Sequence, residues 1–229
     1  MCIRDRDYLL ISQLVEIKFL ISLSQQTDIP RKSIYRLSIY QRCLERLKEN
    51  GLDTVSSNSL AKAAGVKSAQ LRKDLAHFGQ FGTRGLGYSV DALIEVITGV
   101  LGTSSLLPVI LVGVGNLGSA LLKYSGFNRE GFEISAAFES DQNRLKTVDA
   151  DIPVMDVSQM TQYVKDYDVK IAIIAVPAET AQQVANALVN AGVQAFLNFS
   201  STVLKTPDNV IVNSVDLALE LEHLSYFVK

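Results

Sequence analysis

The sequence is poor in cysteine and histidine, and this scarcity excludes two classes of protein. Two cysteines and two histidines occur among 229 residues. Two cysteines cannot form the disulfide framework of a small secreted protein, and Cys43 lies in a helical pattern that predicts a packed thiol. Because neither a C-x-x-C motif nor a histidine cluster is present, the sequence predicts no metal site. We therefore expect a protein of the reducing cytoplasm.

The sequence also lacks a long uncharged hydrophobic run. The most apolar stretch near the N-terminus, residues 8–23, is interrupted by Glu16 and Lys18. These charges argue against a secretory signal and a membrane helix, so we expect no membrane partner. Residues 1–6 resemble a spurious translated leader, and we expect residues 1–28 to be an extension of doubtful authenticity.

The near-neutral net charge of −2 hides a strong asymmetry along the chain. Residues 30–90 hold eleven Lys and Arg against four Asp and Glu, whereas residues 91–229 hold eight against sixteen. A basic module is thus joined to an acidic one. Composition drift could produce this difference, but a basic N-terminal module is typical of proteins that face nucleic acid.

The glycine-rich stretch at residues 108–118 is the most informative part of the chain. An apolar run predicts a buried strand at residues 109–112, and a helix is expected to follow the glycines. Gly113, Gly115 and Gly118 have G-x-G-x-x-G spacing, which suits a tight turn, close approach of a pyrophosphate and close helix packing, respectively. The free N–H groups of the helix N-terminus would bind the phosphates. We expect the whole loop to contact a dinucleotide, with Val114, Asn116 and Leu117 between the glycines.

Glu139 strengthens this interpretation. It ends a second predicted strand, residues 132–138, and lies twenty-one residues after Gly118. A carboxylate at that position is expected to bind the ribose hydroxyls of NAD(H) and to repel the 2′-phosphate of NADP(H). The alternative is a glycine turn in a Rossmann-like domain that binds no dinucleotide.

The chain beyond Glu139 continues to alternate between helix and strand. This alternation predicts a Rossmann-type, doubly wound parallel sheet. Helices are expected at residues 158–167, 179–191 and 216–227, and strands at residues 170–176, 194–198 and 210–213.

The basic module reads as a helix-turn-helix. A helix starts at Pro30 and ends at residues 50–51, and a second opens with Ser57 or Asn58 as its N-cap. Gly65 makes a turn, and Ser68 is expected to cap a third helix that runs to His77. Two short helices joined by a glycine-containing turn are typical of this motif.

The third helix suits the DNA major groove. Leu71 and Leu75 are spaced to face inward, and polar side chains lie between them. Such a helix could also be an ordinary solvated face. The residues expected to face DNA are Ser68, Gln70, Arg72, Lys73 and His77.

Residues 78–88 follow with four glycines interleaved with aromatic residues and Arg84. This pattern predicts a β-hairpin wing whose Arg84 reaches the phosphate backbone or the minor groove. The run lacks the order of a dinucleotide loop and the lysine of a Walker motif, so we reject a phosphate loop. A helix is expected at residues 90–101, with a linker at residues 102–105.

Residues 68–75 and the run from Phe78 to Tyr88 resemble the Rex family of redox-sensing transcriptional repressors, and the resemblance covers about residues 29–229. It implies a homodimer that binds a palindromic operator DNA and releases it when NADH replaces NAD. It also implies that the C-terminal helix is exchanged between subunits. The implied domains are residues 29–104, a winged helix-turn-helix; residues 105–214, a Rossmann NAD(H)-binding domain; and residues 215–229, a dimerisation helix.

The resemblance also assigns roles to individual residues. Arg72, Lys73 and Arg84 would contact DNA, and Tyr124 would lie near the nicotinamide. Arg42 and Asp216 would form a contact between modules that depends on the redox state. The pair Asn198–Phe199 matches a family segment of the nucleotide domain.

Three positions depart from the family pattern. Glu139 stands where Asp is usual, Ser200 begins a segment that often contains proline, and His77 stands where Tyr is common. Glutamate can still accept from both ribose hydroxyls, so NAD(H) preference is expected to persist.

Two other functions are compatible with the same modules. One is an NAD-dependent dehydrogenase with an N-terminal interaction module, but no catalytic histidine–acid or lysine arrangement is evident, so we expect no enzyme and no catalytic residue. The other is a DNA-binding protein whose Rossmann domain serves only dimerisation.

Overall fold

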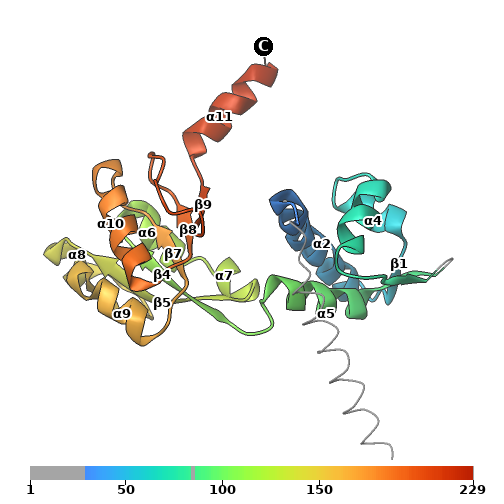
Figure 1. Cartoon of the computed structure of the whole chain (residues 1–229), viewed down its shortest axis with the longest axis horizontal. Helices are drawn as coiled ribbons and strands as arrows, with labels where there is room; N and C mark the ends of the chain where they lie inside the picture. The colour runs from blue at the N-terminus through green and yellow to red at the C-terminus, as the bar shows by residue number, and fades with distance from the viewer. Residues whose placement is uncertain (1–28, 84–85, 229) are drawn as a thin grey trace, which may run out of the picture. The chain divides into compact units, whose positions relative to one another are not determined.

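The computed structural model describes residues 29–83 and 86–228 (Figure 1). The expectations for residues 1–28 and for Arg84 lie outside these residues. The chain divides into two compact units, Met1–Ser104 and Ser105–Lys229. Within the described residues, no helix has the length and apolar character needed to cross a membrane.

Four helices form the bulk of the described part of the N-terminal unit. Helix α2 follows Pro30 and ends before Asn50, as predicted. Gly65 has a φ of +67°, so it makes the expected turn between the two short helices of the motif. Apolar residues of all four helices, including Leu37, Leu60 and Leu71, form one buried core. The bounds are α2 Arg31–Glu49, α3 Ser57–Ala63, α4 Ser68–Ala76 and α5 Val90–Leu101.

Both predicted N-caps in this unit are wrong, by one or two residues. The hydroxyl of Ser56 accepts the N–H of Ser59 at 3.0 Å, so Ser56, and neither Ser57 nor Asn58, caps α3. Lys67 occupies the N-cap position of α4 and makes no side-chain cap, while Ser68 is already helical. Ser56 and Lys67 have extended backbones with ψ near 150°, and this conformation decides where each helix can begin.

A three-stranded antiparallel sheet completes the unit. Its strands are β1 Thr54–Val55, β2 Gly82–Thr83 and β3 Gly87–Ser89, in the order β1-β3-β2. β2 and β3 form the predicted hairpin. Gly87 has a φ of +83°, and a Cβ there would collide with the carbonyl of Val55 in β1, so only glycine is compatible with this position.

The C-terminal unit contains the predicted doubly wound sheet. Six parallel strands lie in the order β6-β5-β4-β7-β8-β9. The chain starts at β4 and winds first toward β6 and then toward β9, so the switch point lies between β4 and β7. The strands are β4 Leu107–Val112, β5 Phe132–Glu139, β6 Val154–Asp156, β7 Ile171–Ile174, β8 Ala195–Asn198 and β9 Ile211–Ser214.

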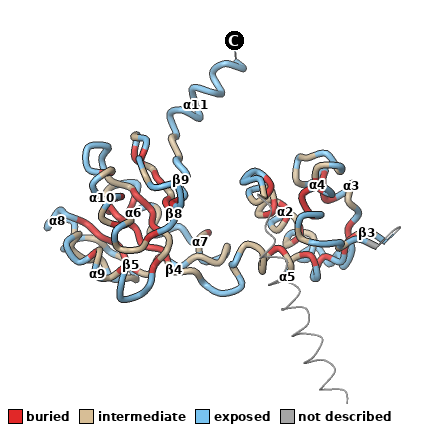
Figure 2. The backbone as a smooth tube through the Cα atoms, in the orientation of Figure 1, coloured by how far each residue is buried: buried red, intermediate tan, exposed pale blue. Residues whose placement is uncertain are grey.

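Helices cover both faces of this sheet. One face packs on Met160 and Val164 of α9 and on Ala181 of α10, and the other packs on Leu121 and Leu122 of α6. Strands β4, β5 and β7 between them are buried along most of their length, whereas the edge strand β9 buries none of its residues (Figure 2). The helices are α6 Asn116–Leu122, α7 Gly126–Arg129, α8 Gln142–Thr147, α9 Met160–Asp166, α10 Ala178–Ala191 and α11 Leu217–Ser225, with 3₁₀ turns at Val157–Gln159 and Tyr226–Val228.

The structure adds four elements that the sequence pattern did not predict. They are β1, α7, α8 and β6, with two, four, six and three residues. Elements this short show no measurable periodicity, and α8 buries no residue at all.

Asp74 connects α4 to α2 inside the N-terminal unit. Its carboxylate is fully buried and accepts Arg36 Nε at 2.6 Å, Arg36 Nη2 at 2.7 Å and the Tyr40 hydroxyl at 2.8 Å. Gln70 of α4 donates to the same carboxylate at 2.9 Å. Burial alone would raise the pKa of Asp74, but these donors outweigh it and lower the pKa to about 2.

The substitution Asp74→Asn should destabilise the unit, because it leaves the Arg36 guanidinium without its counter-charge. We expect the free energy of unfolding to fall by about 3 kcal/mol. The depressed pKa means that the wild-type advantage is complete above about pH 4 and is lost as the pH falls toward about 2. Chemical denaturation at pH 7, 4 and 2.5 measures both effects.

Asp91→Asn is the matched control for this prediction. Asp91 pairs with Lys48 at 2.8 Å, but both side chains are largely exposed. We expect a much smaller loss of stability than for Asp74→Asn, because water solvates both of these exposed charges in the folded and in the unfolded protein. Equal effects of the two substitutions would contradict a special role of the buried carboxylate.

Candidate functional site

The glycine turn leaves β4 at the switch point of the sheet. Gly113 has a φ of +93°, and a Cβ there would lie 2.5 Å from the carbonyl oxygen of Ala175. A Cβ on Gly118 would collide with the carbonyl of Gly113. Helix α6 can therefore pack against the turn only because its residue 118 is a glycine. Gly115 is the N-cap of α6. The tight turn and the close helix packing expected of this motif are therefore present.

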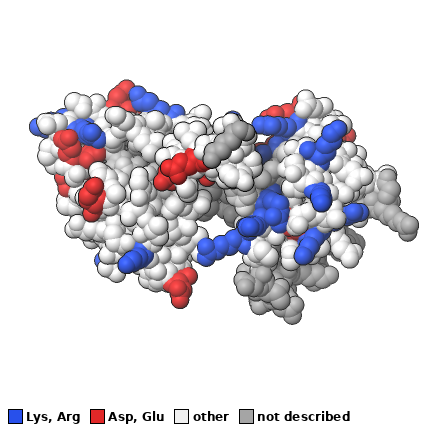
Figure 3. Space-filling view, turned by 90° about the horizontal axis from the view of Figure 1, so that it is seen from above, with Lys and Arg blue, Asp and Glu red and all other residues white. Residues whose placement is uncertain are grey.

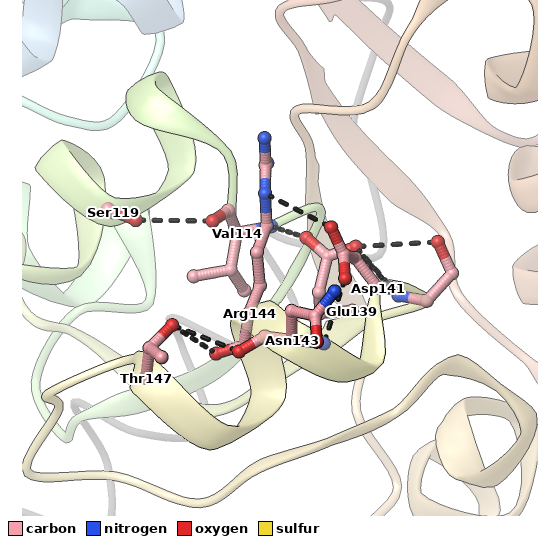
Figure 4. A network of polar contacts seen from close by, with 8 residues as sticks. Val114, Ser119, Glu139, Asp141, Asn143, Arg144 and Thr147 are labelled. Carbon is pink, nitrogen blue, oxygen red and sulfur yellow. Dashed lines mark hydrogen bonds and ion pairs between the residues drawn. The ribbon is translucent and has the colours of Figure 1, made fainter.

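Glu139 fastens the end of β5 to this turn (Figure 4). Its Oε2 accepts the N–H of Val114 at 2.8 Å, and its Oε1 accepts those of Ser140 and Asp141 at 2.7 and 3.0 Å. Burial raises the pKa of Glu139, but the backbone donors lower it by more than burial raises it. The net pKa is below its usual value, so the carboxylate is ionised at neutral pH. Among the described residues Oε2 accepts only the Val114 N–H, which leaves it room for a hydroxyl donor.

A cavity of about 440 Å³ lies beside Glu139. The ends of β4 and β5 and the helices α9 and α10 enclose it with mostly apolar side chains, among them Val112, Met160, Val176 and Val184. A pocket of this kind, next to a carboxylate at a switch point, suits the adenosine half of a dinucleotide.

Arg144 is a site residue that the motif did not reveal. It lies on α8, and a Cβ built on Gly115 would approach its Nη1 to 2.9 Å, so the guanidinium lies over the glycine loop (Figure 4). Its Nε lies 3.7 Å from Asp141 Oδ2. A cation over the loop is suited to bind phosphate. The only sequence signal was an arginine five residues after Glu139, and the fingerprint does not extend that far.

Tyr124 lies just beyond α6 and is 55% exposed. Its ring packs edge-to-face on Phe127, with 5.1 Å between centroids. Asn116 and Leu117 are also exposed at the start of α6, whereas Val114 is buried. The aromatic ring is therefore accessible to a ligand in this unit.

Helix α4 divides into a packed side and an accessible side, as predicted. Leu71 and Leu75 are buried. Ser68 and Gln70 are only partly exposed, and Gln70 is held by Asp74. Arg72, Lys73 and His77 are exposed, and Lys and Arg side chains predominate on the N-terminal unit in Figure 3.

A groove of about 520 Å³ runs between α4 and the hairpin. Its lining includes Arg72 and Ala76 of α4, Phe81 and Gly82 of the hairpin segment, and Ser57 of α3. An open groove bounded by a basic helix and a glycine-rich hairpin suits the sugar–phosphate backbone of DNA.

Asn198 explains why serine is compatible with position 200. Its side chain is fully buried, and its Oδ1 accepts the N–H of Ser200 at 3.0 Å and the hydroxyl at 2.6 Å. Its Nδ2 donates to the carbonyl of Thr202 at 2.9 Å and to Ser214 Oγ at 3.2 Å. Ser200 thus supplies a backbone donor that proline lacks, and the segment after β8 is fixed by hydrogen bonds.

Arg42 and Asp216 lie in different units. Arg42 is exposed on α2. Asp216 caps α11 and accepts the N–H groups of Ala218 and Leu219 at 2.9 and 3.1 Å. The contact between them stays a prediction.

Gly118→Ala should destabilise the C-terminal unit, because the added Cβ meets backbone that cannot move without shifting α6. We expect a loss of about 2–3 kcal/mol in chemical denaturation. Gly115→Ala is the control: its Cβ meets only the end of the Arg144 side chain, so the loss should stay below about 1 kcal/mol. If Gly118→Ala lost less stability than Gly115→Ala, this account of the turn would be refuted.

Each of the two units matches a known protein family model. A family model described as a CoA binding domain matches residues 105–202, and one described as a putative DNA-binding protein N-terminus matches residues 28–76. A solved structure described as RSP in complex with β-NAD+ and operator DNA superposes with a TM-score of 0.82 at 36% identity, covering 89% of this chain and 94% of that one. RSP in complex with β-NADH gives a TM-score of 0.79 at 34% identity, covering 89% and 95%.

Curated relatives match over most of their length. The redox-sensing transcriptional repressor Rex of Pelotomaculum thermopropionicum is 46% identical over 198 residues, which are 86% of this chain and 93% of that protein. Rex of Streptomyces coelicolor is 45% identical over 203 residues, 89% of this chain and 79% of that protein. Identity at this level across both units shows that the chain belongs to the Rex family of redox-sensing transcriptional repressors.

Proposed function

We propose that this chain acts as a homodimer that represses transcription by binding a palindromic operator and releases it when NADH binds. The observation that carries the proposal is the presence, in one chain, of a basic helix-turn-helix and a dinucleotide loop with a buried carboxylate. The RSP structures described with β-NAD+, β-NADH and operator DNA support the same ligands here.

The proposed DNA surface is the accessible side of α4 with the hairpin. Leu71 and Leu75 pack the inner side of the helix into the core of the unit. Arg72 and Lys73 are therefore on its accessible side, from which they can reach base edges or phosphates. The groove between α4 and the hairpin would receive the backbone. The DNA-contacting residues proposed are Ser68, Gln70, Arg72, Lys73, His77 and Arg84.

The proposed nucleotide site follows the glycine loop. Gly115 and the N-terminus of α6 would bind the pyrophosphate, with Arg144 above it. Oε2 of Glu139 would accept a ribose hydroxyl and exclude a 2′-phosphate by charge repulsion. The apolar cavity would hold the adenine, and Tyr124 would lie near the nicotinamide.

Helix α11 supplies the argument for a dimer. It buries none of its residues, and its leucines 217, 219, 221 and 224 are between 58% and 68% exposed (Figure 2). Leaving so much apolar surface in water is unfavourable. Packing against a second copy of the chain would bury these leucine side chains. We propose that α11 is exchanged between subunits.

Coupling between the sites requires that NADH bind one arrangement of the dimer better than the other. A palindrome demands a fixed distance between two α4 helices, so a change in how the units associate changes operator affinity. Arg42 and Asp216, on separate units, would form a charge pair in only one arrangement. A coupling of about 1–3 kcal/mol would weaken binding roughly 5–150-fold.

NADH should weaken operator binding within that range, whereas NAD+ at equal concentration should not. A fluorescence-anisotropy titration of a labelled operator at constant ionic strength measures this. Arg72→Ala with Lys73→Ala should abolish operator binding and leave NADH affinity unchanged. Lys165→Ala removes an exposed charge from α9 and is the matched control.

Other results would favour the other functions. Operator affinity independent of NADH, in a protein that binds NADH, would refute the switch. Failure to bind NADH at all would favour a Rossmann domain that serves only dimerisation. Turnover of NADH with a panel of carbonyl substrates would favour a dehydrogenase, whereas the proposed repressor leaves NADH unchanged.

Leu221→Glu with Leu224→Glu should convert the dimer to a monomer, because two carboxylates would be buried in the interface. Sedimentation velocity measures the oligomeric state. Val203→Glu is the control, since Val203 is 87% exposed outside α11 and its replacement should leave the dimer intact. A double variant that stays dimeric would exclude α11 as the interface.

A further inference from the structure

The acceptor capacity of Asp74 is completely used. Oδ1 receives Arg36 Nη2 and Gln70 Nε2, and Oδ2 receives Arg36 Nε and the Tyr40 hydroxyl. A carboxylate has about four acceptor positions, so none is left for water or DNA. Asp74 therefore does not itself contact a base, although it lies on the recognition helix.

The charge of Asp74 determines which way the amide of Gln70 turns. An ionised carboxylate can only accept, so the NH2 group of Gln70, and not its carbonyl, must face it. The opposite orientation would place two oxygens in contact inside the unit. The carbonyl oxygen and the second N–H of Gln70 are thereby left for another partner.

Gln70 is placed where such a partner would be a base. It is the third residue of α4, partly exposed, and it precedes the exposed Arg72 and Lys73. Side chains near the N-terminus of a recognition helix are those that reach base edges in the major groove. One carbonyl and one N–H are the pair that matches N6–H and N7 of adenine.

We propose that Asp74 is a positioning residue that fixes the amide of Gln70, and that Gln70 so oriented selects adenine at one position of each operator half-site. This inference rests on the proposed function of α4 in DNA binding. It assigns the buried acid of the recognition helix a role in sequence readout, in addition to its role in stability.

The test measures affinity for a panel of operator duplexes in which each base pair is changed in turn. Gln70→Ala should lose about tenfold discrimination at one symmetric position and none elsewhere. Asp74→Asn, assayed at a temperature where it is folded, allows the amide to turn and should relax the choice between adenine and guanine there.

Two controls separate this readout from simpler effects. Gln162 donates to Asp166 at 2.7 Å with the same spacing of four residues, but in the C-terminal unit, so Gln162→Ala should change no base preference. Arg72→Ala should weaken binding at every sequence to a similar extent if it contacts phosphate. If Gln70→Ala keeps the wild-type base preference at every position, the inference is wrong. The proposed function would survive that result as long as the wild-type protein binds the operator.

A second measurement does not depend on any variant that may unfold. In the wild-type protein the side-chain amide of Gln70 should exchange its protons with solvent at least tenfold more slowly than that of the exposed Gln159, whose side chain makes no cap hydrogen bond, as observed by NMR. Equal exchange rates would show that Asp74 does not hold the amide. Absence of operator binding by the wild type would instead contradict the proposed function itself.

Discussion

The contact between the Glu139 carboxylate and the N–H of Val114 is the constraint on which the nucleotide unit depends. It joins the ends of the first two strands of the winding order at the point where the sheet changes direction. The contact is possible only because Gly113 turns the chain with a φ of +93°. A side chain at Gly113 or Gly118 would separate the turn from the strand ends, and the carboxylate would then lose one of the three backbone donors that offset its burial.

The two units each bury one essential carboxylate but use it differently. Asp74 is saturated by side chains, so it can only position its neighbours. Glu139 is held by backbone N–H groups and keeps acceptor capacity on Oε2, so it can also bind a ligand. In both cases the donors lower the pKa of the acid despite its burial. An acid whose acceptor positions are all used can only orient neighbouring side chains, whereas an acid with an unused acceptor position can also bind a ligand.

Much of the fold followed from sequence periodicity, and the exceptions have physical causes. The long helices α2, α5 and α10 and the buried strands β4 and β5 were predicted within a few residues, because burial imposes their pattern. The N-caps at Ser56 and Lys67 were missed, because backbone extension rather than residue type decides between adjacent positions. The elements α7, α8 and β6 are too short for a periodic signal.

The site was predictable only where a motif has fixed spacing. Gly113, Gly118 and Glu139 lie together as expected, because one strand–turn–helix brings them together. Arg144 was not predicted, since its place over Gly115 depends on the fold of α8. The role of Asp74 was missed for a related reason: its partners Arg36 and Tyr40 are more than thirty residues away, and only packing of α2 on α4 joins them.

The same buried contacts suggest why a signal can pass between the units without loosening either one. A ligand changes an equilibrium only through its different affinity for two states. Since Glu139 joins β5 to the glycine turn and Asp74 joins α4 to α2, the difference need not arise from melting of the glycine turn or of α4. It would arise instead in the elements that remain exposed, above all in α11 and its N-cap Asp216. The buried contacts would then keep the ligand loop and the recognition helix intact, while the exposed helix carries the change in association.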